Sequence, residues 1–329
     1  MEILGSELTT IRIGGLIQCF EQPTSAQALQ VVLQQKHKNL KIIGGGSNLI
    51  FADEGFRGTV VRPLLMDIQE SEADVYSKEI ASWRKMEIAS GRYSENTKYT
   101  QEKDVEGEIV LLEVGSGVIW AKLVAYCLSN RLAGLEVYAR IPCRVGGAVR
   151  NNIHAGSELL SRHVVAVESL NTNGITTLYN QNSLEFGYDT SRFLTQPECI
   201  TRAIFGLKRV SAEHSLENTE QYRSIIQRKT TQQPSGPNCG SVFQNLVADG
   251  DKPVSAAWYI EQAGCKGIQR GGLGVSCVHA NFIVNNGNGT QEDFLELVKT
   301  VQGCVYKKFN LELTPEVEVI DQEGRSRWD

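Results

Sequence analysis

The sequence predicts a soluble globular fold that mixes α-helices with β-strands. The 329 residues have 41% hydrophobic and 22% charged content, which is ordinary for a soluble protein with a substantial core. Short apolar runs that lead into glycine turns alternate with segments whose apolar residues recur at helical spacing. No apolar run approaches the ~18–20 residues that a membrane helix needs, so we expect no membrane partner.

Charge and cysteine content narrow the function classes. A net charge of −5 argues against a nucleic-acid partner, because phosphate binding needs a basic surface. The start of the chain lacks the basic and apolar regions of an export signal, so we expect a cytoplasmic protein. The eight cysteines include no C-x-x-C pair and no zinc-like spacing to a histidine. This pattern predicts reduced, buried thiols and no metal site.

Residues 1–65 are predicted to form a first lobe. Alternating apolar residues around Gly14-Gly15 indicate a strand. Ser25 is a candidate N-cap for a helix over residues 26–35, whose apolar residues share one face. The strands expected in this lobe are 11–20, 40–43 and 56–61.

Residues 66–108 break this pattern. They contain 11 acidic residues against 6 basic ones, a difference of −5 that equals the net charge of the whole chain. Such a segment is expected to bury little surface, so we interpret most of it as a solvated, partly mobile insertion. An exposed loop without a specific role is the simplest interpretation.

A second lobe, residues 109–210, and a C-terminal domain, residues 211–329, are predicted to follow, with a boundary at the polar run 211–222. Thr290 and Asp293 form a capping-box pattern before a helix whose apolar residues recur at helical spacing to Phe309. The other expected elements are strands at 109–114, 164–171, 175–179, 199–207 and 311–320, and helices at 120–130 and 221–229.

Three glycine-rich segments are candidates for anion binding. Gly44-Gly45-Gly46-Ser47-Asn48 follows a predicted strand, so its backbone N–H groups can converge on an anion without interference from Cβ atoms. Gly115-Ser116-Gly117 and Gly146-Gly147 are predicted to be similar turns at strand ends, and together the three could wrap an extended diphosphate. A tight turn without a ligand is the alternative for each, and none matches the dinucleotide-binding pattern G-x-G-x-x-G.

Ser241 and Glu316 are candidates for proton chemistry. Ser241 follows Gly240 in a turn-rich stretch, and the absence of a G-x-S-x-G pattern argues against a hydrolase nucleophile. It is either a proton donor or substrate hydrogen-bonder, or a turn residue that satisfies its own backbone. Glu316 lies in a predicted strand, where a solvent-facing position is the alternative. His279 and Asn281 occupy alternate positions of another predicted strand, where a satisfied, partly buried pair is the alternative.

The order of these motifs resembles that in the UDP-N-acetylenolpyruvoylglucosamine reductases. The resemblance covers nearly the whole chain apart from the acidic insertion. It is carried by residues 10–15, 44–49, 134–136, 141–142, 145–148, 186–188 with Ser191 and Phe193, 240–243 with Asn245, 260–267, 279–285 and 313–317.

This resemblance implies a fold and a reaction. The fold is α+β, with a two-lobed FAD-binding domain of the vanillyl-alcohol-oxidase (PCMH) type and a C-terminal α+β substrate-binding domain. The reaction reduces the enolpyruvyl ether of a UDP-linked amino sugar to UDP-N-acetylmuramate for peptidoglycan synthesis, with FAD as cofactor and NADPH as co-substrate. The negative charge that develops on the substrate needs stabilisation and a proton. We expect a monomer or a weak dimer.

The resemblance also implies roles for single residues. Ser241 would be the proton donor, and Glu316 would lie at the substrate carboxylate, where it must hold or share a proton to avoid repulsion. The residues expected to bind the cofactor are Gly44, Gly45, Gly46, Ser47, Asn48, Gly115, Pro142, Val145, Gly146, Gly147, Ala148 and Asn152. Those expected to bind the substrate are Tyr188, Ser191, Asn245, His279 and Asn281.

The chain departs from the family motifs at several positions. Asp189 stands where the family has an arginine that binds the substrate carboxylate, and a carboxylate there repels an anion unless it is protonated or paired. Arg192 is a candidate replacement, but in an extended strand positions 189 and 192 face opposite sides. The stretch 151–154 ends in His154 where the family usually has Met-Asn-Ala-Gly. Cys143-Arg144 replaces glycine followed by serine or threonine.

Three functions are therefore open. The first is an active reductase of this family. The second is a relative that binds FAD or a UDP-sugar with weak or no reductase activity because of Asp189. The third is a flavin oxidoreductase of the same fold that acts on another substrate.

Overall fold

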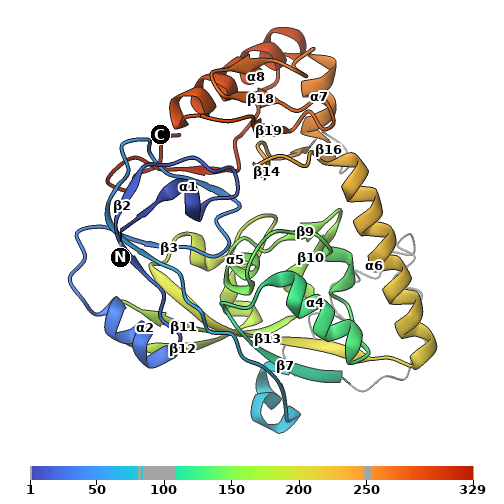
Figure 1. The fold of residues 1–329 in the computed structure, drawn as a ribbon. Helices are drawn as coiled ribbons and strands as arrows, with labels where there is room; N and C mark the ends of the chain where they lie inside the picture. The colour runs from blue at the N-terminus through green and yellow to red at the C-terminus, as the bar shows by residue number, and fades with distance from the viewer. Residues whose placement is uncertain (1, 81–82, 84–108, 248–252, 329) are drawn as a thin grey trace. The chain divides into compact units, whose positions relative to one another are not determined.

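The chain folds into two compact units, each of which is described by itself (Figure 1). The computed structural model describes residues 2–80, 83, 109–247 and 253–328. Unit 1 comprises residues 1–21, 37–61 and 227–329, and unit 2 comprises residues 22–36 and 62–226. Unit 1 thus joins most of the expected first lobe to most of the expected C-terminal domain. None of the helices in the described residues has the length and apolar character to span a bilayer.

Unit 1 contains a four-stranded sheet in the order β1-β2-β5-β3 and a second one in the order β14-β19-β18-β17. In the first, β2, β5 and β3 run parallel and β1 is antiparallel; the second is antiparallel throughout. Unit 1 also contains two short strand pairs, β4 with β20 and β15 with β16. The elements are β1 (Ile3–Leu4), α1 (Gly5–Leu8), β2 (Leu16–Glu21), β3 (Leu40–Ile42), β4 (Leu49–Ile50), β5 (Phe56–Val61), β14 (Asn238–Ser241), β15 (Leu246–Val247), β16 (Pro253–Val254), α7 (Ala256–Gln262), β17 (Gln269–Arg270), β18 (Leu273–Val275), β19 (Phe282–Asn285), α8 (Gln291–Phe309) and β20 (Glu318–Val319).

Helix α8 packs against strands β17 and β18 of the second sheet in unit 1 (Figure 1). Thr290 and Asp293 form the predicted capping box, and the helix ends where Asn310 adopts a left-handed conformation. The apolar residues at helical spacing, such as Phe294 and Val298, are fully buried. Burial of a side chain of this size contributes roughly 1.5–3 kcal/mol, so the apolar face stabilises α8 more than its cap does.

Unit 2 is built on a sheet in the order β12-β11-β13-β7-β6, with β8 also paired to β13. All neighbouring strands are antiparallel. The elements are α2 (Ala26–Leu33), β6 (Ile68–Ser71), η1 (Ala73–Tyr76), β7 (Ile109–Gly115), α4 (Trp120–Ser129), β8 (Leu132–Ala133), η2 (Glu136–Tyr138), α5 (Val145–Arg150), β9 (His154–Ala155), β10 (Glu158–Leu159), η3 (Leu160–Arg162), β11 (Val164–Asn171), β12 (Thr176–Asn180), η4 (Gln181–Leu184), η5 (Arg192–Leu194) and β13 (Glu198–Arg209).

Both faces of the unit 2 sheet are covered. On β7, Leu112 packs into a cluster around Trp120 of α4, whereas its neighbour Leu111 packs against Tyr76 and Trp83 on the opposite face. This alternation follows from the two-residue period of a strand. The Trp83 indole N–H also donates to the carbonyl oxygen of Arg162 at 2.7 Å.

The first part of the acidic segment is therefore not an exposed loop, which corrects the expectation for its described residues. Strand β6 adds an edge to the sheet, and Tyr76, Ile80 and Trp83 are buried. For these described residues the expectation was wrong because a count of charges ignores the few apolar residues between the acids. Residues 81–82 and 84–108 lie outside the described part.

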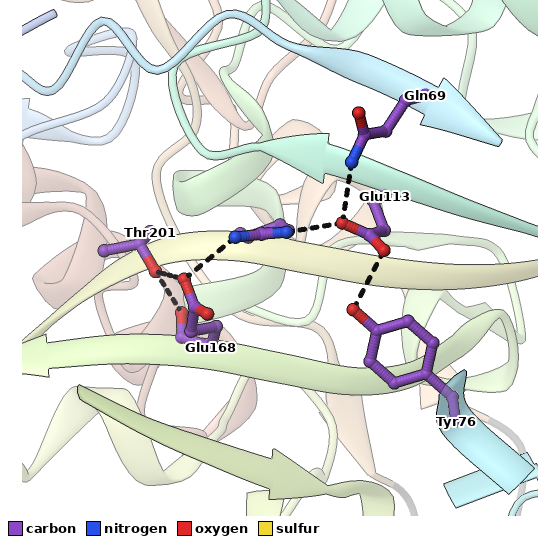
Figure 2. A network of polar contacts seen from close by, with 6 residues as sticks. Gln69, Tyr76, Glu113, Glu168 and Thr201 are labelled. Carbon is purple, nitrogen blue, oxygen red and sulfur yellow. Dashed lines mark hydrogen bonds and ion pairs between the residues drawn. The ribbon is translucent and has the colours of Figure 1, made fainter. Parts of the chain in front are cut away.

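A polar network accompanies this packing (Figure 2). The buried Glu113 carboxylate accepts hydrogen bonds from Tyr76 at 3.0 Å and Gln69 at 3.1 Å, and it pairs with Arg202. Arg202 also lies 3.6 Å from Glu168. The Arg202 guanidinium of β13 thus lies between the carboxylates of β7 and β11 and offsets part of their charge, and Glu113 also binds the start of the acidic segment.

Helix α6 (Ala212–Gln232) replaces the boundary expected at 211–222. The boundary between the two compact units falls within this helix, after residue 226. None of its residues is buried, and Leu216 is 67% exposed. The sequence prediction missed its first half because it relied on an apolar face that this helix does not have.

Candidate active site

Ser241 lies at a turn that depends on glycine. It ends β14 and pairs with Phe282 of β19. The preceding Gly240 has φ = +81°, a left-handed conformation that favours glycine, and its N–H donates to the Asn238 side chain at 3.0 Å. A Cβ added at Gly240 would meet no described atom within 4 Å. The backbone beside Ser241 is thus left open on this side.

Thr10 connects this turn to the first glycine segment. Its hydroxyl donates to the carbonyl oxygen of Asn238 at 2.6 Å, and its N–H donates to the carbonyl oxygen of Gly46 at 3.0 Å. Gly46 has φ = +70°, and a Cβ there would lie 1.9 Å from the carbonyl oxygen of Leu8. The close approach therefore requires glycine, and it follows β3 as the sequence predicts.

Glu316 lies against both of these segments. Its N–H donates to the carbonyl oxygen of Val242 at 2.9 Å, and its own carbonyl oxygen accepts from the Asn48 side chain at 3.0 Å. Three motifs that are far apart in the sequence, residues 44–48, 240–243 and 313–317, are therefore joined in unit 1. The strand expected at 311–320 is shorter than predicted, since only β20 is regular, and Glu316 precedes it.

Cys239 lies in the same cluster. Burial raises the pKa of its thiol to about 12, and the nearby Glu316 carboxylate adds to this effect. The thiol is therefore protonated at neutral pH and a poor nucleophile. The Glu316 carboxylate is therefore close enough to affect Cys239, which lies two positions before Ser241.

Two of the residues expected to bind substrate form side-chain hydrogen bonds to the backbone of unit 1. The buried Asn281 amide accepts from the N–H of Phe243 at 2.9 Å and donates to its carbonyl oxygen at 2.8 Å. The Asn245 amide oxygen accepts from the N–H of Ala256 at 3.2 Å, at the start of α7. Both arrangements support a positioning role for these asparagines.

His279 differs from these asparagines. It is partly buried, and its Nδ1 has no hydrogen-bond partner among the described residues. Burial lowers the pKa of the imidazole, and the positive charge of Lys266 adds to this effect, so the neutral form is favoured. The strand predicted to hold His279 begins only at Phe282, because the preceding residues form a turn.

The other glycine segments belong to unit 2. Gly115 ends β7, as predicted, but Gly146 and Gly147 lie in helix α5 and not in a turn at a strand end. The N–H of Gly146 donates to the carbonyl oxygen of Ser116 at 2.9 Å, which joins the two segments. A Cβ added at Gly147 would meet no described atom within 4 Å. Pro142 precedes α5, and Val145 and Ala148 are buried within it.

Asn152 organises a second group of site residues in unit 2. It is fully buried in a left-handed conformation, with φ = +41°. Its side chain donates to the carbonyl oxygen of Gly187 at 2.7 Å and accepts from the N–H of Ser161 at 2.8 Å. Ser191 is also buried, and its hydroxyl donates to the carbonyl oxygen of Arg150 at 2.6 Å. The segment that contains Tyr188 is thus fixed on both sides.

Asp189 is paired with His154, which sequence analysis noted only as a separate departure. Oδ1 of Asp189 lies 3.4 Å from Nε2 of His154, and the His154 ring stacks on Tyr188 with centroids 4.6 Å apart. Arg192, the candidate replacement for the family arginine, contacts other residues of unit 2. It donates to the carbonyl oxygen of Ser183 at 2.9 Å, and its guanidinium lies 3.8 Å from the Tyr179 ring centroid.

Comparison with known proteins decides the family. Residues 231–320 match the model of the UDP-N-acetylenolpyruvoylglucosamine reductase C-terminal domain, and residues 96–178 match an FAD binding domain. The UDP-N-acetylenolpyruvoylglucosamine reductase of Chlamydia felis is 32% identical over 96% of this chain and 92% of the relative. That of Carboxydothermus hydrogenoformans is 31% identical over 95% of this chain and 91% of the relative. The chain belongs to the UDP-N-acetylenolpyruvoylglucosamine reductase family.

A solved structure of this reductase family confirms the fold. The crystal structure of the reductase from Thermus caldophilus matches with a TM-score of 0.70 and 26% sequence identity, over 97% of this chain and 98% of that one. The predicted α+β class, with an FAD-binding domain of the PCMH type and a C-terminal reductase-family domain, is therefore correct.

The residues of unit 2 fit an FAD of this reductase family. The Ser116 hydroxyl is buried without a hydrogen-bond partner among the described residues, beside the open backbone of Gly147. Arg62 and Arg144 place two positive charges close together. Burial lowers the pKa of Arg62, and the charge of Arg144 lowers it further. A diphosphate would accept a hydrogen bond from the hydroxyl and be stabilised by the positive charge of both arginines.

Sequence reasoning missed several residues of this site. Arg62 was not singled out, and Arg144 and His154 were noted only as departures from the family motif. No local pattern could have joined His154 to Asp189, which are 35 positions apart. For Arg62 the available signal was a cation directly after β5, at the end of a strand.

Proposed function

We propose that this chain uses FAD and NADPH to reduce UDP-N-acetylenolpyruvoylglucosamine to UDP-N-acetylmuramate in peptidoglycan precursor synthesis. The observation that carries the proposal is the junction of residues 44–48, 240–243 and 313–317 around Ser241 and Glu316 in unit 1. Family membership supports the substrate, since the relatives that match this chain have that name. We place the reaction in the cytoplasm and expect a monomer or a weak dimer.

Ser241 is the proposed proton donor. Its position after the left-handed Gly240 leaves open backbone beside it, and the hydrogen bond from Glu316 N–H to Val242 fixes the adjacent chain. When substrate accepts a hydride, negative charge develops beside its carboxylate, and a nearby hydroxyl can donate the proton that completes the reduction. A serine hydroxyl at a rigid turn meets this need because its Oγ can be held at one place.

Glu316 is the proposed partner of the substrate carboxylate. A charged glutamate would repel that group, so it must hold or share a proton when substrate is bound. The Asn48 side chain fixes the backbone of Glu316, which orients its carboxyl group. A shared proton between the two carboxyl groups would stabilise the developing charge without a metal ion.

FAD, held in unit 2 by Ser116, Gly147, Arg62 and Arg144, would carry hydride from NADPH to the substrate. The arginine pair favours the diphosphate, and the glycines permit close approach of the backbone. Tyr188 is the proposed aromatic contact of the sugar nucleotide, since the residue is 44% exposed while its neighbours in the segment are held by hydrogen bonds.

Anaerobic stopped-flow spectroscopy tests the proposed function. Protein reduced with one equivalent of NADPH is mixed with UDP-N-acetylenolpyruvoylglucosamine, and the return of oxidised flavin absorbance is followed. We expect rapid reoxidation with formation of UDP-N-acetylmuramate. UDP-N-acetylglucosamine, which lacks the vinyl ether, is the control. Reoxidation no faster than with this control would exclude the proposed reaction.

A second candidate function is a relative that binds the nucleotide but reduces it poorly. Asp189 favours this candidate, because a partly buried carboxylate stands at the position of the family arginine. The same experiment separates the two, since a poor reductase would bind UDP-N-acetylenolpyruvoylglucosamine in a titration but leave the flavin reduced after mixing.

A further inference from the structure

Three unfavourable features coincide at His154 and Asp189. Asp189 adopts a left-handed conformation with φ = +51°, which is uncommon for a residue with a side chain. Its Oδ2 and the Nδ1 of His154 are both buried without hydrogen-bond partners among the described residues. Structures retain such features mainly at functional sites, where another requirement outweighs their cost.

The pair is held in place by its surroundings. Asn152, also left-handed, donates to Gly187, and Gly187 and Thr190 are bridged across the turn that carries Asp189. The His154 ring lies against Tyr188 at 4.6 Å and is tilted by 33°. The contact with Asp189 is thus determined by the fold of this segment and does not depend on a mobile side chain.

Charge explains why the two residues occur together. Burial raises the pKa of Asp189, and the charge of His154 opposes that rise. An unpaired carboxylate at this position would repel an anionic ligand, and a proton carried by the adjacent His154 ring would offset that repulsion. The only ion pair of Asp189 in the described residues is with His154.

We propose that His154 is a positioning and charge-compensating residue that permits Asp189 at the substrate-carboxylate position and orients Tyr188 beside it. The inference rests on the proposed function, because it assigns the substrate carboxylate to this segment. His154 stands where the family has glycine, and Asp189 stands where it has arginine. These two departures then form one paired replacement. Asp189 is then no obstacle to the binding of an anionic nucleotide.

Calorimetric titration of the whole FAD-loaded protein tests this inference without turnover. The ligands are UDP-N-acetylenolpyruvoylglucosamine, which carries the carboxylate, and UDP-N-acetylglucosamine, which does not. His154→Phe keeps an aromatic ring but removes the compensating charge. We expect it to weaken binding of the first ligand at least ~tenfold more than binding of the second, because it leaves a partly buried carboxylate without its partner.

Two further variants separate charge from packing. In His154→Phe/Asp189→Asn neither position is charged, and we expect most of the lost preference to return. His154→Lys keeps the charge without the ring, and we expect its ratio of the two dissociation constants to stay within about threefold of the unmodified protein. His214→Phe, at a partly exposed position in the first turn of α6, is the matched control for the histidine-to-phenylalanine change.

The outcomes are distinguishable. If the unmodified protein binds neither nucleotide, the proposed function fails, and this inference fails with it. If it binds both, but His154→Phe and the double variant have the same ratio of dissociation constants as the unmodified protein, only the present inference is overturned. If His154→Phe does not fold, a His154→Lys ratio shifted tenfold or more against the carboxylate ligand is the overturning result.

Discussion

Both ends of the Asn281 side-chain amide bind the backbone of Phe243, whose N–H and carbonyl oxygen lie 2.9 Å and 2.8 Å away. The side chain thus takes the place of a strand neighbour for a buried residue two positions after Ser241. It makes the proposed proton donor depend on the turn that precedes β19.

Replacement of Asn281 by alanine is expected to destabilise the protein. The change leaves the buried N–H and carbonyl oxygen of Phe243 without partners, at a cost of roughly 1–3 kcal/mol for each group. Asn286→Ala, at an exposed position of the following turn, is the control and should change the free energy of unfolding by less than about 0.5 kcal/mol. Urea unfolding measures both. Equal stabilities of the two variants would show that the Asn281 contacts are not structural.

Gly46→Ala is expected to prevent formation of the first glycine turn. The new Cβ would lie 1.9 Å from the carbonyl oxygen of Leu8, and the left-handed backbone at φ = +70° adds about 1–2 kcal/mol. Thermal unfolding should show a large loss of stability, with less FAD retained on purification. Gly303→Ala is the matched control, because Gly303 lies in α8 and its Cβ would meet nothing within 4 Å. That variant should gain about 0.5–1 kcal/mol. Normal stability and FAD content in Gly46→Ala would contradict the close approach described here.

Glu113→Gln is expected to reduce stability in a pH-dependent way. Burial alone would raise the pKa of Glu113, but hydrogen bonds from Arg202, Ser71, Gln69 and Tyr76 outweigh it, so the pKa is lowered on folding. A lowered carboxyl pKa contributes stability above the unfolded pKa of about 4.3, and this contribution is lost as the pH falls through the folded pKa. The deficit of the variant should therefore be largest near neutral pH and shrink in acid.

The size of the Glu113 effect follows from its exposure. Glu113 is 7% exposed, but the Arg202 side chain is 37% exposed, so solvent screening keeps the loss near 1–3 kcal/mol at pH 7. Glu70→Gln is the control, since the Glu70–Arg209 pair is exposed on both sides and contributes roughly 0–1 kcal/mol. Unfolding at a series of pH values measures both variants. If the loss of unfolding free energy in Glu113→Gln became larger as the pH falls, the proposed lowering of the Glu113 pKa would be wrong.

Ser241→Ala is expected to separate the two halves of the proposed reaction. Flavin reduction by NADPH needs no proton from Ser241 and should proceed at the normal rate. Reoxidation by the enolpyruvyl nucleotide should slow by about 10²–10⁴-fold, the usual contribution of a general acid. Ser241→Cys, which keeps a proton on a small side chain, should recover part of the rate. Stopped-flow absorbance follows both halves, and unchanged reoxidation in Ser241→Ala would remove the proton-donor assignment.

Helices with a cap and an apolar face were predictable from the sequence. Ser25 accepts from the N–H of Ala28 at the start of α2, and Thr290 and Asp293 cap α8 as their spacing indicates. The first half of α6 was not predictable in this way, because it buries no side chain. Local patterns detect an element through its contact with a core, and they fail where that contact is absent.

The candidate site was predictable in its members but not in its pairings. The motifs around Gly46, Ser241 and Glu316 were identified as separate segments, and long-range hydrogen bonds from the backbone and from the Asn48 side chain join them in unit 1. The predicted turn at Gly146-Gly147 is a helix, since glycine permits both conformations and the sequence does not distinguish them. The contact of His154 with Asp189 depends on the fold of β9 and the turn after η4.

The Trp83 indole packs against Gly206 of β13, where no side chain intervenes. A Cβ at residue 206 would come within 2.8 Å of the indole ring, so any larger residue there would displace the tryptophan from its place on β13. Anyone who shortens the acidic segment for crystallisation or engineering should therefore begin the deletion after residue 83. Removal of the indole as well would expose the apolar residues that it covers on this face of the sheet, and such an exposed face favours aggregation.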